Sequence, residues 1–201
     1  MKDGGEYARL PPFPSGMTAS VLPKEESMAD VQYPIGKFEE DPDATDAKRA
    51  GWIQVVTDTP GLFRRAVAGL RDPQLETTYR PGGWTVRQVV HHMPDAHLHT
   101  MVRFRLALTE DNPLVPGYAP PKWAELPDAK TGPVDVSLAL LEAIHGRWVL
   151  LLKAMAAPDF ARTFRRPDGQ VITLNRALQT YAWHGRHHAA QITTLRQRMG
   201  W

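Results

Sequence analysis

The stretch NRALQTYAWHGRHHAAQITTLRQRM occupies residues 175–199 and carries a sustained helical pattern. Its inward positions alternate steps of three and four residues, which is typical of the seam of a helix in a bundle. Within it, His184 and His188 are four residues apart, so a helix places both imidazoles on one face. The seam positions are Leu178, Tyr181, Gly185, His188, Ile192, Leu195 and Met199.

Three more stretches have apolar residues at helical spacing, at 46–70, 85–109 and 136–157. Pro60 is expected to kink the first of them, because it cannot donate a hydrogen bond to the carbonyl of Val56. Four such helices predict an all-α protein with the architecture of a four-helix bundle.

The remaining segments complete this prediction. Residues 111–133 contain six prolines and predict a long, structureless loop, ordered over the site by Tyr118 and Trp123. Residues 163–164 and 171–173 flank a Pro-Asp-Gly turn, which predicts a short β-hairpin. Residues 1–43 are rich in proline, glycine and charge and predict an extended or mobile arm, so the bundle domain is expected at 44–201.

Composition narrows the function. Cysteine is absent from the 201 residues, so any metal is held by nitrogen and oxygen donors. The formal net charge is +2 with scattered Lys and Arg residues, which speaks against a nucleic-acid partner. Without a long apolar run or a signal pattern, neither a membrane partner nor secretion is indicated, and a cytoplasmic protein is expected.

A third histidine from another helix would complete a metal site with His184 and His188 and leave one coordination position open, as in catalytic zinc sites. The pair His91 and His92 is the source, but both flank the apolar stripe of their helix at similar offsets, so periodicity alone leaves the choice open. The alternative is that these histidines are core residues with satisfied hydrogen bonds.

Other histidines are weighed by their helical phase. His187 lies on another side of its helix from His188, so it is expected to face water or the surroundings of the ligands. His97, His99 and His145 lie on or near apolar stripes, where packing or hydrogen bonding is the expected role. Asp95 follows His92 by one turn and is either a helper near the metal or a solvated carboxylate.

The stretch GGWTVRQVVHHMPD at residues 82–95 resembles the signature of the YfiT-like branch of the DinB superfamily. So do YPIG at 33–36, HGRW at 145–148, WHGRHH at 183–188 and RMGW at 198–201. The resemblance implies a cytoplasmic, homodimeric four-helix bundle that binds one divalent ion, zinc or nickel, through His92, His184 and His188. Pro94 departs from the family pattern and puts the local helix geometry in doubt.

Members of this family are labelled metal-dependent hydrolases, and some are linked to thiol S-transfer using bacillithiol. A dipositive ion on three neutral imidazoles lowers the pKa of a water or thiol in its open position. Metallopeptidases have a glutamate directly after the first histidine, but here Gly185 stands there and is expected to leave room for a substrate.

S-transfer is therefore the favoured hypothesis, in which a low-molecular-weight thiol attacks a small electrophilic substrate. Arg186 in a catalytic role and Arg165 in cofactor binding are expected to steer anionic groups. A hydrolase that uses Asp95 as its base is the alternative, and a non-catalytic metal-binding stress-response module is the third hypothesis.

Overall fold

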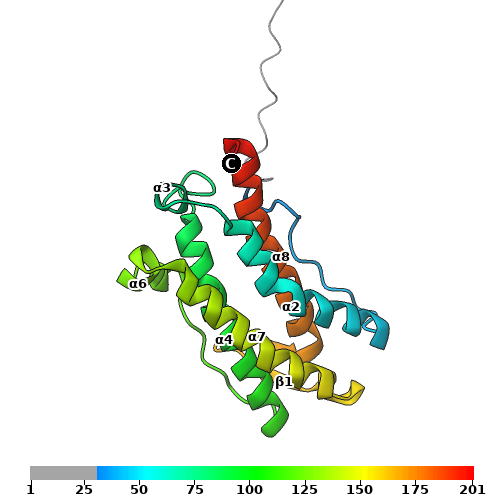
Figure 1. Cartoon of the computed structure of the whole chain (residues 1–201). Coiled ribbons are helices and arrows are strands. Elements are labelled where there is room, and N and C mark those ends of the chain that lie inside the picture. The colour runs from blue at the N-terminus through cyan, green and yellow to red at the C-terminus, as the bar shows by residue number, and fades with distance from the viewer. Residues whose placement is uncertain (1–30) are drawn as a thin grey trace, which may run out of the picture.

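A computed structural model describes residues 31–201 of the chain. Its four long helices pack as a bundle, in which α2 and α4 each contact both α7 and α8 (Figure 1). The predicted all-α four-helix bundle is therefore confirmed. The long helices are α2 (Asp46–Val67), α4 (Val86–Thr109), α7 (Val134–Ala154) and α8 (Leu174–Met199).

Threonine side chains cap the start of three of these helices: Thr45 on α2, Thr85 on α4 and Thr173 on α8. The Thr85 hydroxyl accepts from the backbone N–H of Gln88, and the Gln88 side chain accepts in return from the N–H of Thr85, at 3.1 and 2.9 Å. Thr173 caps α8 by accepting from the N–H of Arg176. At its other end α8 stops at Gly200, whose φ of +71° lies in the left-handed region that favours glycine.

The predicted hairpin is confirmed and leads directly into α8. Strand β1 (Thr163–Arg165) pairs antiparallel with β2 (Val171–Thr173), with Phe164 opposite Ile172 and both side chains buried. The short 3-10 helix η1 (Ala157–Ala161) precedes it. The hairpin and the C-terminus lie at opposite ends of the bundle (Figure 1).

The proline-rich connection is not structureless, so that part of the prediction is wrong. It contains the short helices α5 (Pro120–Trp123) and α6 (Pro127–Thr131), each of which starts with proline at a position where the missing N–H costs nothing. The aromatic anchors hold as expected, because Tyr118 stacks on His99 at 4.5 Å and packs on Trp123 at 4.8 Å between ring centroids. A further short helix, α3 (Asp72–Leu75), follows α2.

Residues 31–43, the last part of the predicted arm, run along α8. The N–H of Asp41 donates to the side-chain oxygen of Gln179 at 2.8 Å, and the indole N–H of Trp183 donates to the carbonyl of Gly36 at 3.2 Å. Residues 1–30 lie outside the described residues, and the domain boundary at residue 44 stays a prediction.

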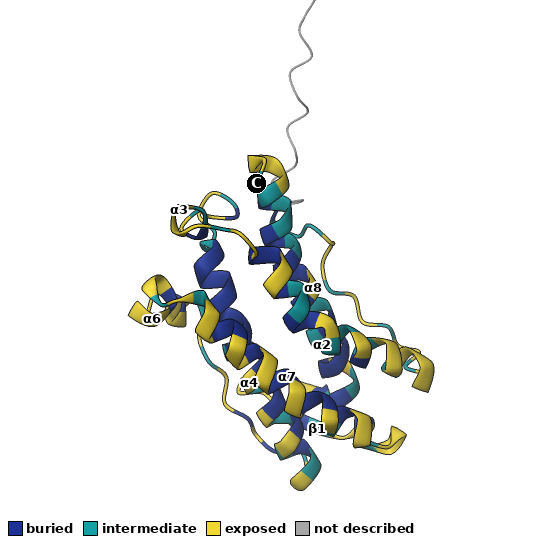
Figure 2. Ribbon diagram, viewed as in Figure 1, coloured by how far each residue is buried: buried dark blue, intermediate teal, exposed yellow. Residues whose placement is uncertain are grey.

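A polar layer crosses the middle of the bundle, between two apolar clusters. One cluster surrounds Trp148 and Phe104 towards the hairpin, and the other surrounds Phe63 and Met93. Each long helix has buried stretches along the inside of the bundle (Figure 2). Between the two clusters, these stretches include buried polar side chains. These are Thr59 on α2, His97 on α4, His145 on α7 and His188 on α8.

No helix within residues 31–201 is both long and apolar enough to cross a membrane.

Gly185 lies where α8 meets α2 and does not leave room for a substrate, so that expectation is wrong. A Cβ atom at Gly185 would come within 2.8 Å of both Oγ1 and Cγ2 of Thr59. Thr59 is only 1% exposed, and its hydroxyl is held by the carbonyl of Val55 at 2.9 Å. Thr59 of the neighbouring helix α2 therefore occupies the space that a side chain at residue 185 would need.

We predict that Gly185→Ala lowers the free energy of unfolding by about 1–3 kcal/mol, because the added methyl group overpacks this contact. In a Thr59→Ala background the cost should largely vanish, since the nearest remaining atom would be the Cβ at 3.4 Å. Gly146→Ala on α7 is the matched control: nothing lies within 4 Å, so it should stabilise by about 0.5–1 kcal/mol. Urea unfolding of the four variants measures this, and an equal cost in both backgrounds would contradict the assignment.

Candidate metal centre

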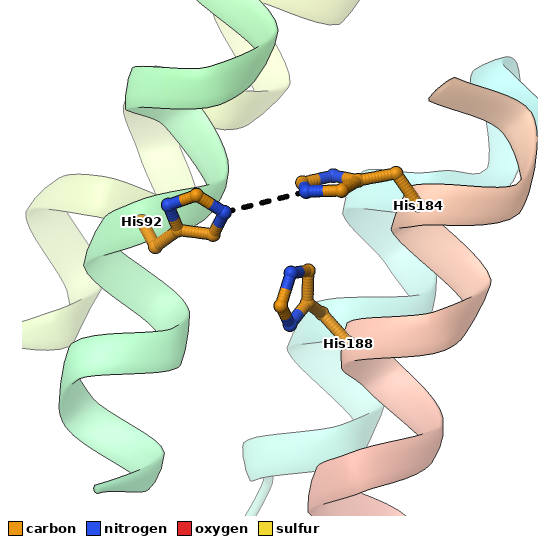
Figure 3. A group of neighbouring side chains, drawn as sticks. All are labelled: His92, His184 and His188. Atoms are coloured by element: carbon orange, nitrogen blue, oxygen red, sulfur yellow. Dashed lines mark hydrogen bonds between the residues drawn. The ribbon is translucent and has the colours of Figure 1, made fainter. Parts of the chain in front are cut away.

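Three histidines from two helices converge at one point of the polar layer. His92 extends from α4, and His184 and His188 extend from α8 towards it (Figure 3). One ring nitrogen from each lies within 4.8 Å of the other two, and the Nε2 atoms of His92 and His184 are 3.3 Å apart. Of the residues that the structure describes, these three form the group with the spacing of a metal site.

The structure decides between the two upstream histidines. His91 points away from the group, with Nδ1 at 2.7 Å from the hydroxyl of Ser137 and Nε2 at 3.1 Å from the carbonyl of Gly132. Consecutive residues on a helix are about 100° apart, so only one of the pair can face α8. His92 is that residue.

Burial keeps these imidazoles neutral. It lowers the pKa of His92 to about 4, and it lowers the pKa values of His184 and His188 well below the ordinary value, with neighbouring histidines adding to the effect. At pH 7 each ring therefore carries a free lone pair, which is the form that binds metal.

Each of the three rings is oriented through its Nδ1 atom. The hydroxyl of Tyr118 lies 3.3 Å from Nδ1 of His92, and Nε2 of His97 lies 3.2 Å from Nδ1 of His184. Nδ1 of His188 donates to the side-chain oxygen of Gln191 at 2.8 Å. With every Nδ1 engaged in this way, the three Nε2 atoms are the ones that face the common point.

His97 and His145 pack and hydrogen-bond as expected, but their arrangement goes further than the sequence indicated. Behind His184, Nδ1 of His97 lies 2.8 Å from Nε2 of His145, and Nδ1 of His145 lies 2.6 Å from the carbonyl oxygen of Val56. The chain of contacts therefore joins α8, α4, α7 and α2. The apolar periodicity of a single helix does not indicate such a chain, because each of its contacts joins two different helices.

His187 is buried, so the expectation that it faces water is wrong. Its ring stacks on Trp183 at 4.5 Å and lies 5.6 Å from the ring of Tyr33, a residue of the predicted arm that covers this side of α8. Gln191 contacts His187 at 3.0 Å and also binds His188, which places His187 in the surroundings of the ligands, the other part of the expectation.

The other predicted site residues do not hydrogen-bond to the three histidines. Asp95 is half-buried, and burial raises the pKa of its carboxyl to about 6, with the charge of Asp128 adding to the shift. Arg186 is exposed, because two residues after His184 a helix has turned to the opposite side. Arg165 is exposed on β1 and donates to the carbonyl of Asn112 at 3.2 Å.

Two cavities flank the group and show how a small molecule could reach it. One, of about 530 Å³, is lined by both Tyr118, which contacts His92, and Tyr181, whose ring lies 5.3 Å from that of His184. The other, of about 400 Å³, is lined by His187 and His188 themselves.

Sequence reasoning missed Arg103, which lines the larger cavity. It donates to the hydroxyl of Tyr181 at 3.3 Å, and its Nε is buried without an acceptor from residues 31–201. Two other arginines of this cavity are paired, Arg166 with Asp168 and Arg176 with Glu40. Arg103 lies eleven residues after His92 and thus on the same face of α4. This spacing was the signal from which the sequence could have predicted that Arg103 lies near the site.

The group fits a divalent ion. Two nitrogens bound tetrahedrally to zinc at about 2.0–2.1 Å are separated by about 3.4 Å. The Nε2 atoms of His92 and His184 are 3.3 Å apart, which already matches that separation. Three imidazoles without cysteine suit zinc and also nickel.

Known proteins have sequences similar to that of this chain. A "Putative metal-dependent hydrolase" of Bacillus cereus (strain AH820) is 50% identical over 174 residues, which are 87% of this chain and 100% of that relative. A protein of Bacillus mycoides (strain KBAB4) with the same description is 49% identical over the same shares.

A solved structure agrees with these relatives. It is described as "YfiT from Bacillus subtilis is a probable metal-dependent hydrolase with an unusual four-helix bundle topology". The TM-score is 0.84 and the identity 45%, over 86% of this chain and 99% of that chain. The family model of the DinB superfamily matches residues 28–192. The fold, the histidine group and these matches together show that the chain belongs to the DinB superfamily.

Proposed function

We propose that this protein is a metal-dependent enzyme in which His92, His184 and His188 hold one divalent ion. The observation that carries the proposal is the convergence of three Nε2 atoms, each set by a partner on its own Nδ1, beside two cavities. Three protein ligands leave a coordination position for a substrate, whereas structural zinc sites use four.

When bound, the ion would lower the pKa of a thiol or a water molecule that occupies the remaining position. The protein's own residues do the rest. The buried imidazoles stay neutral and keep their lone pairs, and the aromatic rings of Tyr118 and Tyr181 line the approach to them.

The favoured reaction is transfer of a low-molecular-weight thiol to an electrophile. The thiol loses its proton to solvent, its sulfur forms a bond to carbon, and the leaving group departs with the electrons of the bond that breaks. This reaction needs no general base on the protein once the thiol is ionised. Among residues 31–201, the side chains that hydrogen-bond to the three histidines are Tyr118, His97 and Gln191, none of which is a carboxylate.

Hydrolysis by water is the second candidate, and two observations favour it. The half-buried carboxyl of Asp95 has a pKa raised to about 6, which suits a general base near neutral pH. The relatives from Bacillus are also described as metal-dependent hydrolases. The zinc or nickel preference, the homodimer and the small-molecule substrate remain predictions.

Arg103 replaces Arg165 and Arg186 in our proposal for substrate recognition. Its guanidinium lies over the ring of Phe164, 6.0 Å from the ring centre, in a cavity lined mostly by apolar side chains. Because none of the described carboxylates pairs with it, a carboxylate on the thiol would supply the missing negative charge.

We predict that His92→Ala, His184→Ala and His188→Ala each lose the bound ion, because two imidazoles hold it too weakly. His187→Ala is the matched control from the same helix, since its nitrogens do not face the common point, and it should retain one ion per chain. Metal analysis after purification with zinc measures all four variants. A full equivalent of metal in His188→Ala would overturn the ligand assignment.

We predict that the zinc-loaded protein joins a thiol to 1-chloro-2,4-dinitrobenzene and releases chloride, and that removal of the metal by a chelator abolishes this activity. Asp95→Asn should leave thiol turnover within about a factor of three, because the thiol route needs no base on the protein. Ester hydrolysis without thiol that is lost in Asp95→Asn would instead establish the hydrolase. Bound metal without turnover of either kind would leave a metal-binding module.

Arg103→Gln should raise the KM for N-acetylcysteine about tenfold or more, because a charge-assisted hydrogen bond is lost. The neutral amide of N-acetylcysteine should show no such change. Arg147→Gln, at an exposed position on α7, is the control and should behave like the unmodified protein. Equal effects on the two thiols would contradict a role for Arg103 in binding an anion.

A further inference from the structure

We propose that His97 and His145 are positioning residues that hold His184 in the one tautomer able to bind the metal through Nε2. In this proposal, the carbonyl of Val56 sets the direction of the whole chain of hydrogen bonds. The inference rests on the proposed metal site and adds to it the groups that prepare one of its ligands.

The chain of hydrogen bonds starts at a backbone carbonyl of α2 that lacks its regular helical donor. In a regular helix the carbonyl of Val56 would accept from the N–H of residue 60, but residue 60 is proline and has no N–H. Both residues are buried, so water does not readily replace the missing donor. Nδ1 of His145 takes that place at 2.6 Å.

The direction of each hydrogen bond follows from this start. A carbonyl oxygen only accepts, so Nδ1 of His145 carries the proton and its Nε2 is an acceptor. Nδ1 of His97 must then donate to His145, which leaves Nε2 of His97 as an acceptor at 3.2 Å from His184. Nδ1 of His184 donates to it, and Nε2 of His184 is left with a lone pair that faces His92 and His188.

His97 and His145 accept these hydrogen bonds only as neutral rings, since a protonated imidazole has no acceptor. His97 is 0% and His145 is 2% exposed. A charged imidazole buried to this degree, with no anionic partner, is strongly unfavourable. No charged side chain hydrogen-bonds to either ring in the part of the chain that the structure describes.

Packing keeps the two rings in place. They stack on each other at 4.8 Å between centroids, and the ring of Trp148 meets both edge-on at 5.9 and 5.8 Å. Trp148 is itself fully buried. The orientation of His184 is thereby tied to three other helices, whereas Gln191, the partner of His188, lies on the same helix as its ligand.

The first experiment uses His97→Phe and His145→Phe, which replace the imidazole by an aromatic ring that has no nitrogen. Zinc affinity, measured by competition with a chromophoric chelator, should fall about 10–100-fold in each, because partners of this kind contribute that much to metal affinity. The control is His91→Phe, which removes another buried, hydrogen-bonded imidazole on α4 that is outside the chain. His91→Phe should lose thermal stability. It should keep the zinc affinity of the unmodified protein and, when loaded with cobalt instead of zinc, the same absorption spectrum.

The second experiment needs no substitution and therefore does not depend on a variant's folding. Nitrogen-15 chemical shifts of the histidines in the metal-free protein should show the proton on Nδ1 in His145, His97 and His184. A proton on Nε2 of His97 or His145 would falsify the proposal. Unchanged zinc affinity in both His97→Phe and His145→Phe, with zinc binding by the unmodified protein, would also contradict it. If the unmodified protein bound no metal, the proposed metal site would be overturned, but the result on the tautomers would stand.

Discussion

Burial of imidazoles in the middle of the bundle is the constraint on which the rest of the structure depends. A buried polar group without a hydrogen bond costs about 1–3 kcal/mol, so each ring in this layer needs a partner. The partners come from every long helix and from the loop: the Val56 carbonyl on α2, His97 on α4, His145 on α7, Gln191 on α8 and the Tyr118 hydroxyl. Two apolar clusters above and below the layer then hold these partners in place.

The same constraint shapes the chemistry of the site. Satisfying every Nδ1 leaves the three Nε2 atoms pointing at one another, an arrangement that is unfavourable until a proton or a cation lies between them. This orientation of the rings is the one that a metal site held by three histidines needs. The cavity beside it is lined by Tyr118 and Tyr181, and Arg103 contacts Tyr181 there, which is the basis of our proposal that the substrate has an anionic end.

Much of this fold could be predicted because the signals are local. Alternating steps of three and four residues located the long helices to within a few residues, Thr85 marked the start of one, and a Pro-Asp-Gly turn marked the hairpin. The errors concern contacts between distant segments. The pattern in α8 cannot show that Thr59 fills the space beside Gly185, because Thr59 is more than a hundred residues away. Nor can it decide whether His187 faces water or the surroundings of the ligands, because nothing in α8 indicates that Tyr33 covers it.

The sequence by itself determined that His184 and His188 share a helix face, that nitrogen and oxygen donors are the ones available, and that four helices form the domain. Those properties follow from the pitch of a helix and from composition. The helical pattern left His91 and His92 equivalent; the family resemblance implied His92, and the tertiary structure shows that His92 faces α8. Only the tertiary structure decided that the carbonyl of Val56, left by Pro60, accepts from His145 and that Arg103 reaches the cavity. The rotation of each helix about its axis depends on all its neighbours at once, and no local pattern contains that information.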